Sequence, residues 1–326
     1  MIIENIKPFD GQHCETTATG TLLRQLNIEL SEPMLFGLGE GLGFIFWNMK
    51  TMDFPFLGGR VKPDVLTQHI AKNLNLELTV QETSSPQKAW DAVKGLIDAR
   101  QVVGLKLDCY HLDYFSRRFH FAGHYAALYG YDNESAFLVD TRQQGGLVKT
   151  SLRSLALARG EKGPMASKNL FYTLQKTSKP FDLKKVMVTA IRNNAADYLN
   201  PPITNIGYKG ILKTSAEIIT WFKNSHDIEN EFKSAALLME KAGTGGALFR
   251  NLYRDFLQES YQLLKLDKLK SAYQEFAEVA ILWTSVSTLF EQVSKTKDFK
   301  YIEQASGILK TISVKEKKAM ELLLAV

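Results

Sequence analysis

The pattern of residues changes near position 178, and this change limits the fold more than any other feature of the chain. Before it, short β-like runs alternate with a few helical stretches and many glycines. These runs are Val102–Leu107, His124–Tyr131, Ala136–Val139 and Leu170–Leu174.

After position 178, apolar residues recur three and four positions apart through three long stretches. These stretches are Ile211–Phe222, Ala247–Leu266 and Tyr273–Phe290. The polar segment Gln175–Pro180 between the two patterns ends in a helix breaker. The sequence therefore predicts an α+β domain over residues 1–178 and an all-α domain over residues 179–326.

Composition and charge exclude several classes of protein. With 45% hydrophobic and 23% charged residues in 326, the chain can bury a sizeable core and is not predominantly disordered. A formal net charge of +5 is too small for a nucleic-acid-binding footprint. Two cysteines do not form a disulfide framework, the first residues lack the features of a signal peptide, and no apolar run approaches the ~20 residues of a membrane span. We expect a cytoplasmic protein with no nucleic-acid or membrane partner.

Cys14 lies where a helix is predicted to begin. Ala18, Leu22 and Leu26 recur every fourth residue, so they share one face of a helix whose first turn contains the cysteine. Unpaired amides and the positive end of the helix dipole favour a thiolate there and could stabilise an oxyanion. The alternative is an inert buried thiol, which is common for free cysteines.

His124 and Asp140 are predicted to open and close a β-hairpin around the turn Asp132–Ser135. A regular register about a four-residue turn would place the two side chains on opposite faces, so a bulge or an odd-length loop is needed to bring them together. If they meet, Asp140 orients the imidazole and His124 takes the thiol proton. The alternative is a hydrogen-bonded structural histidine.

Several motifs together resemble the family of the butirosin biosynthesis protein BtrH, and the chain order Cys, His, Asp also resembles papain-like and C39-like cysteine peptidases. The motifs are Gly11–Ala18, Leu30–Gly39, Gly58–Arg60, Gly123–Tyr125, Gly130–Asp132, Asp140, Asn205–Gly207 and Gly243–Arg250. The resemblance covers nearly the whole chain. It implies a papain-like or C39-like α+β fold followed by the helical domain.

The resemblance also implies a function: transfer of an acyl group from an acyl carrier protein thioester to a small amine, which forms an amide in antibiotic biosynthesis. In this reading Cys14 is the nucleophile, His124 the base and Asp140 the orienting residue. The acyl donor is the phosphopantetheine arm of the carrier, no cofactor is bound directly, and a homo-oligomer is left open. CtaG, an amide-forming protein of closthioamide biosynthesis, is similar. The alternatives are a cysteine hydrolase of the same mechanism and a non-catalytic protein that binds the carrier.

Seven further residues are predicted to contact substrate. Gln12 and His13 flank the nucleophile, although the oxyanion glutamine of papain-like peptidases usually precedes the cysteine by more residues than Gln12 does. Glu40 lies in a glycine-rich loop, where the alternative is a solvated acid, and Asp108 and Tyr110 follow a strand. Gly245 and Arg250 are predicted to form an anion site for the phosphate of the carrier arm, and the alternative there is a glycine turn between two helices with a solvated arginine. Asp108, Cys109, His111, Asp113, His120 and His124 are residue types that bind zinc, but their spacing matches no standard motif, so we predict no metal.

Overall fold

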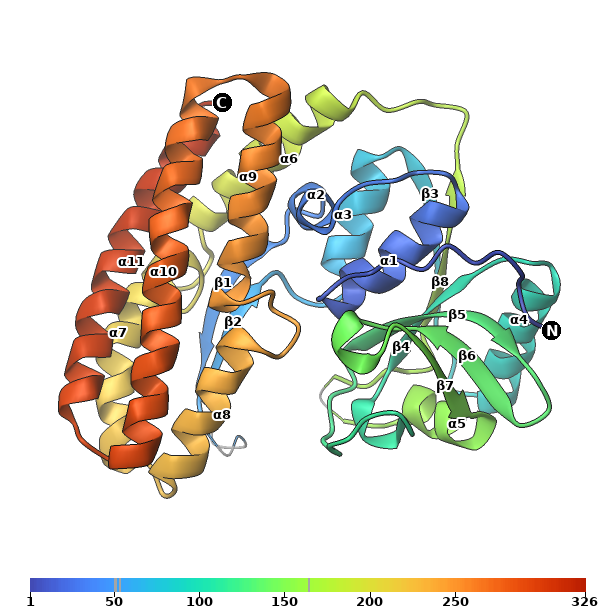
Figure 1. Cartoon of the computed structure of the whole chain (residues 1–326), viewed down its shortest axis with the longest axis horizontal. Coiled ribbons are helices and arrows are strands. Elements are labelled where there is room, and N and C mark those ends of the chain that lie inside the picture. Colours follow the sequence, from blue (N-terminus) through green and yellow to red (C-terminus); the bar gives the residue numbers. More distant parts are fainter. Residues whose placement is uncertain (50–51, 53, 164) are drawn as a thin grey trace. The chain divides into compact units, whose positions relative to one another are not determined.

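The computed structural model describes residues 1–49, 52, 54–163 and 165–326. The chain divides into two compact units (Figure 1): unit 1 comprises Met1–Leu35 and Pro63–Phe181, and unit 2 comprises Phe36–Lys62 and Asp182–Val326. The predicted division at residue 178 lies close to the second junction. It did not anticipate that residues 36–62, from the first half of the sequence, fold with the C-terminal helices.

Unit 1 contains a six-stranded antiparallel sheet of order β3-β8-β4-β5-β6-β7. The strands are β3 (Leu76–Gln81), β4 (Val103–Leu107), β5 (His124–Tyr131), β6 (Ser135–Val139), β7 (Leu147–Ser151) and β8 (Phe171–Lys176). The helices are α1 (Cys14–Gln25), α3 (Val65–Asn73), α4 (Pro86–Asp98) and α5 (Leu152–Gly160), with short 3₁₀ turns η1 (Cys109–His111) and η2 (Arg142–Gln144). The four predicted β-like runs correspond to β4, β5, β6 and β8, and the mixed α+β class is confirmed.

The two faces of this sheet pack against different helices, because successive residues of a strand point to opposite sides. Val103, Leu105 and Leu107 of β4 share a core with residues of α4 and α5. On the other face, Tyr172 of β8 reaches α1, where its hydroxyl hydrogen-bonds Thr19 (2.9 Å). The central strands are therefore covered on both sides, which explains why all five residues of β4 are buried.

Unit 2 combines a two-stranded ribbon with a bundle of helices. The ribbon consists of the antiparallel strands β1 (Leu42–Trp47) and β2 (Phe56–Arg60). The helices are α6 (Leu183–Leu199), α7 (Gly207–Asn224), α8 (Ile228–Glu240), α9 (Arg250–Leu264), α10 (Asp267–Thr296) and α11 (Lys300–Leu324), with η3 (Ala247–Phe249) before α9. A short helix α2 (Glu32–Leu38) spans the first junction between the units. The helical character predicted for the second half of the chain is confirmed.

Candidate active site in the mixed unit

The first helix begins at Cys14, as its periodicity predicted, and His13 is its N-cap. The buried carboxylate of Glu32 holds the preceding turn by accepting the amides of Gln12 (2.9 Å) and His13 (2.8 Å). The same carboxylate accepts the hydroxyl of Thr16 at 2.8 Å. Cys14 itself is partly exposed. The turn that presents the thiol is therefore fixed by a charge-assisted network, while the thiol remains accessible.

A β-bulge brings His124 and Asp140 to the same face of the hairpin. The register of β5 and β6 shifts between Leu128 and Gly130, which leaves Tyr129 as one extra residue on β5. If the pairing of Ala127 with Val139 is continued by one residue, Asp140 lies opposite Ala126. Ala126 is two residues from His124, so the side chains of His124 and Asp140 point to the same face of the hairpin. The bulge that the sequence argument required is present, and Nε2 of His124 lies 2.7 Å from Oδ2 of Asp140.

Asp140 is fully buried and accepts three hydrogen bonds. Its Oδ2 is shared by the imidazole of His124 and the hydroxyl of Tyr114, each at 2.7 Å, and its Oδ1 accepts the amide of Thr141 at 2.6 Å. The sequence did not indicate the bond between Tyr114 and Asp140, because Tyr114 lies in a loop without a motif. Three donors hold this carboxylate in one orientation, which in turn orients the imidazole.

The electrostatics of the pair favour a charged imidazole. Burial lowers the pKa of His124, but the carboxylate of Asp140 and the neighbouring Cys109 outweigh burial, so the pKa lies well above the ordinary value of 6.5. The ring of Phe115 packs edge-on against the imidazole, with a centroid separation of 5.3 Å. His124 is thus held by an anion at Nε2 and by an aromatic ring at its side.

A second thiol lies at this site. Cys109 in η1 is buried, and its side chain is within hydrogen-bonding reach of His124. Burial raises the pKa of Cys109 and so favours the protonated thiol, whereas the interaction with His124 lowers the pKa of this thiol. Cys14 is close enough to both Cys109 and Tyr114 to contribute to raising their pKa values. In the sequence, Cys109 stood out only as one of several residue types that bind zinc, and no motif indicated that it would lie beside the base.

The remaining substrate-site predictions in unit 1 have local structural partners. Gln12 is exposed, and its backbone amide is bonded to Glu32. His13 is buried at the helix cap, with Nδ1 3.5 Å from the hydroxyl of Thr16. Asp108 is buried and accepts the amide of Tyr110 at 2.8 Å, which caps η1. The Tyr110 ring stacks on His120, with 4.2 Å between centroids.

Three predicted residues lie in unit 2, and the structure gives them structural roles. Glu40 is buried and accepts the side-chain amide of Asn193 at 3.0 Å. Gly245 has φ +68°, a left-handed conformation that favours glycine. Arg250 is fully buried rather than exposed to an anion.

The predicted phosphate site at Arg250 is occupied by the protein itself. The guanidinium makes a bidentate pair with Glu316 (2.8 and 2.9 Å) and donates to the carbonyls of Leu248 (2.8 Å) and Gly59 (3.3 Å). Glu316 also accepts the indole N–H of Trp283 at 2.8 Å. Periodicity predicted a helix from Ala247 onward, but residues 247–249 have positive φ and form a left-handed turn before α9 begins. Arg250 therefore anchors this turn to α11.

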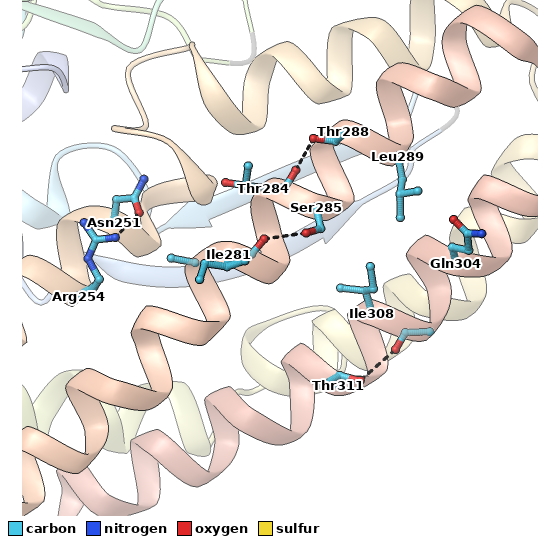
Figure 2. A pocket seen from close by; sticks show the side chains of 12 residues that line it. Asn251, Arg254, Ile281, Thr284, Ser285, Thr288, Leu289, Gln304, Ile308 and Thr311 are labelled. Atoms are coloured by element: carbon cyan, nitrogen blue, oxygen red, sulfur yellow. Dashed lines mark hydrogen bonds between the residues drawn. The ribbon is translucent and has the colours of Figure 1, made fainter.

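Unit 2 carries an open groove between α9, α10 and α11 (Figure 2). Two of its hydroxyls are bonded within their own helix, since Ser285 donates to the Ile281 carbonyl (3.0 Å) and Thr288 to the Thr284 carbonyl (3.0 Å), while the hydroxyl of Thr284 donates to Glu240 of α8 (3.1 Å). Of the described residues that line the groove, Arg254 is the one with a charge. Acid–base or nucleophilic chemistry needs titratable groups that the groove does not offer.

The mixed α+β unit holds both a cysteine at the start of α1 and a buried histidine–aspartate pair, and α1 packs against β5, the strand that begins with His124. Residues 13–141 match the family model described as butirosin biosynthesis protein H, N-terminal, and residues 153–323, just over half of the chain, match the model described as domain of unknown function DUF4872. The chain belongs to this family of butirosin biosynthesis protein H-like proteins, so the resemblance deduced from its motifs is confirmed. No curated protein matches the chain.

The two matched regions do not follow the two structural units, because residues 13–141 include residues 36–62 of unit 2 and residues 153–323 include α5 and β8 of unit 1. The N-terminal family model begins at His13, the cap of α1, and ends at Thr141, the residue after Asp140. It therefore includes all three residues of the candidate site. Among the described residues, no helix is both long and apolar enough to cross a membrane.

Proposed function

We propose that this protein is a cysteine-dependent acyltransferase that moves an acyl group from a carrier-protein thioester through Cys14 to an amine. The observation that carries the proposal is the buried pair of His124 and Asp140 in the unit where a partly exposed cysteine begins α1, the helix that packs against the strand of His124. A nucleophile, a base and an orienting carboxylate are the groups that acyl transfer requires. The family name, which refers to butirosin biosynthesis, supports a role in antibiotic biosynthesis.

The choice of nucleophile follows from burial. Cys109 lies within hydrogen-bonding reach of His124 but is only 2% exposed, whereas Cys14 is partly exposed at the N-terminus of α1, the helix that packs against the strand of His124. A carrier-bound thioester is bulky and needs an accessible sulfur. Burial also raises the pKa of Cys109, which opposes formation of its thiolate. Cys14 is therefore the nucleophile in this proposal, and Cys109 is a neighbour of the base.

The proposed reaction has two half-reactions. In the first, the Cys14 thiol gives its proton to His124 and attacks the thioester carbonyl, and the phosphopantetheine thiolate leaves with that proton. In the second, the amine attacks the Cys14 thioester, His124 takes the amine proton, and Cys14 leaves and recovers a proton. Nε2 of His124 is occupied by Asp140, so Nδ1 is the nitrogen that handles these protons. The overall products are an amide and a free carrier thiol.

The oxyanion donors proposed for this chemistry come from α1. The amides of Gln12 and His13 both donate to Glu32, so these two amides already have an acceptor. The amides of the first helical turn, beginning with Cys14, point out of the N-terminus of α1 and are the natural donors to a developing negative charge. This arrangement, with the order Cys, His, Asp, is the basis for assigning the mixed unit to a papain-like or C39-like fold.

Intact-protein mass spectrometry with acyl-phosphopantetheine thioesters, with and without an added diamine, tests the proposal. We expect an acyl adduct on the wild type that disappears into an amide when the diamine is present. Cys14→Ala should form no adduct. Cys109→Ala, the matched control that removes the other thiol beside His124, should still form one.

The other outcomes are equally informative. Release of the acyl group only as free acid, even with the diamine, identifies a hydrolase instead of a transferase. An adduct that persists in Cys14→Ala but is lost in Cys109→Ala contradicts the choice of nucleophile. No adduct from any donor favours a non-catalytic protein that binds the carrier.

A further inference from the structure

Three potential metal ligands that are dispersed in sequence meet beside the candidate active site. Asp108, His111 and His120 each offer one ligand atom, and these atoms all lie within 4.8 Å of one another. The three residues come from the two ends of the loop that joins β4 to β5. Sequence spacing predicted no metal here because the spacings match no standard motif: eight residues lie between the two histidines, and only the fold of this loop brings the side chains together.

Two of the ligands are held in place by the 3₁₀ turn. Asp108 is the N-cap of η1 and accepts the amide of Tyr110 at 2.8 Å, and His111 is the last residue of the turn. Nε2 of His111 lies 2.6 Å from Oε2 of Glu161. A carboxylate bonded to one histidine nitrogen is the usual device that orients a metal-binding imidazole and strengthens it as a ligand.

The third ligand approaches from the other end of the loop. Nδ1 of His120 lies 3.4 Å from Oδ1 of Asp108, and the ring is stacked nearly parallel on Tyr110 with an interplanar angle of 8°. The amide of Cys109 donates to the carbonyl of Phe121 at 3.2 Å, which ties the same two segments together through the backbone. The position of His120 is therefore set by stacking and by a backbone contact, although its side chain is 59% exposed.

The carboxylate of Asp108 is the strongest indication of a cation. Its side chain is only 2% exposed, and a buried carboxylate is normally paired with a cation or bound to a metal. Its partners among the described residues are one backbone amide and the exposed imidazole of His120. A divalent ion between Asp108 and the two histidines would balance this buried charge.

We propose that Asp108, His111 and His120 bind a divalent transition metal of the zinc type. Two imidazoles and one carboxylate, with a remaining position for water, match the ligand preferences of zinc. With bonds of about 2.1 Å, ligand atoms around tetrahedral zinc lie about 3.4 Å apart, so the ligand atoms, which lie within 4.8 Å of one another, must approach by up to about 1.4 Å. The exposed side chain of His120 can supply that movement. The ion would link the two ends of the β4–β5 loop, and the second of these ends leads into β5, the strand that begins with His124.

Titration of the metal-free full-length protein with zinc chloride, followed by calorimetry and by thermal unfolding, tests this site. We expect one equivalent to bind and to raise the unfolding temperature. His120→Ala should weaken zinc binding about tenfold or more, since it removes a ligand from an exposed position and leaves the core intact. His226→Ala, an exposed histidine in unit 2, is the matched control and should bind zinc as the wild type does.

The proposal is overturned if the wild type binds no zinc, or if His120→Ala binds it as tightly as His226→Ala does. The second result would place the zinc elsewhere, for example at the thiols near His124. Because the readouts are binding and stability, neither result depends on whether the protein transfers acyl groups.

Discussion

Replacing Asp140 with asparagine tests the electrostatic core of the candidate site. The substitution keeps the shape of the side chain but removes the charge that holds the pKa of His124 well above 6.5. Without that charge, the burial of the imidazole dominates, and the pKa of His124 in the folded protein should fall below its value in the unfolded chain. At pH 6, breaking this buried pair should lower the free energy of unfolding by about 3–5 kcal/mol.

The pH dependence has a definite sign. In the wild type, the raised pKa of His124 means that its stabilising contribution is fully present below about pH 6.5 and is lost as the pH rises through the folded-state pKa. In Asp140→Asn, the pKa of His124 in the folded protein is lowered, so the pH dependence of stability has the opposite sign. The free energy of unfolding should increase as the pH rises through about 6.5. The difference in stability between the two proteins should therefore be largest in mild acid and should narrow in alkaline solution.

Urea unfolding at several pH values, together with an NMR titration of His124, measures both effects. Asp98→Asn is a matched control, because Asp98 also accepts hydrogen bonds from a cationic side chain, Lys94 (2.7 Å), and from a tyrosine hydroxyl, Tyr131 (2.6 Å). Unlike Asp140, Asp98 is exposed to solvent. We expect this control to change stability little, since exposed ion pairs contribute weakly. A loss in Asp140→Asn no greater than in the control, or an unchanged pKa of His124, would refute the reasoning.

Three further substitutions test the packing around the site and in the helical unit. Tyr114→Phe removes one of the two donors to the Asp140 oxygen and should cost about 1–3 kcal/mol in urea unfolding; no loss would mean that the bond is dispensable. Arg250→Met leaves Glu316 buried without its partner and should cost about 3–5 kcal/mol, measured in the same way, whereas a cost similar to that of a surface change would contradict the buried network. In Gly104→Ala, the new Cβ would lie 2.2 Å from the ring of Tyr172, so the unfolding temperature should drop by an amount corresponding to about 1–3 kcal/mol; an unchanged temperature would show that the ring can move.

The sequence alone was sufficient for features that depend on local pattern. The start of α1 at Cys14, the strand that begins with His124 and the helical character of the C-terminal region all follow from periodicity and capping over a few consecutive residues. The need for a bulge between His124 and Asp140 also follows from local geometry, because strand residues alternate between faces. These predictions held because their causes lie within one element or one hairpin.

Tertiary structure decided everything that depends on burial and on contacts between distant segments. Arg250 has the sequence context of an anion site, yet it is buried against Glu316, 66 residues away, and no local pattern reveals such a partner. Residues 36–62 join the helical unit although they precede all six strands of the unit 1 sheet in sequence.

The neighbourhood of His124 shows the same limit. Cys109 and Tyr114 belong to it only because the β4–β5 loop folds back on the base, and Asp108 and His120 meet for the same reason. The physical cause is that hydrogen bonds and desolvation act through space, whereas periodicity and turn propensities report only on neighbours along the chain.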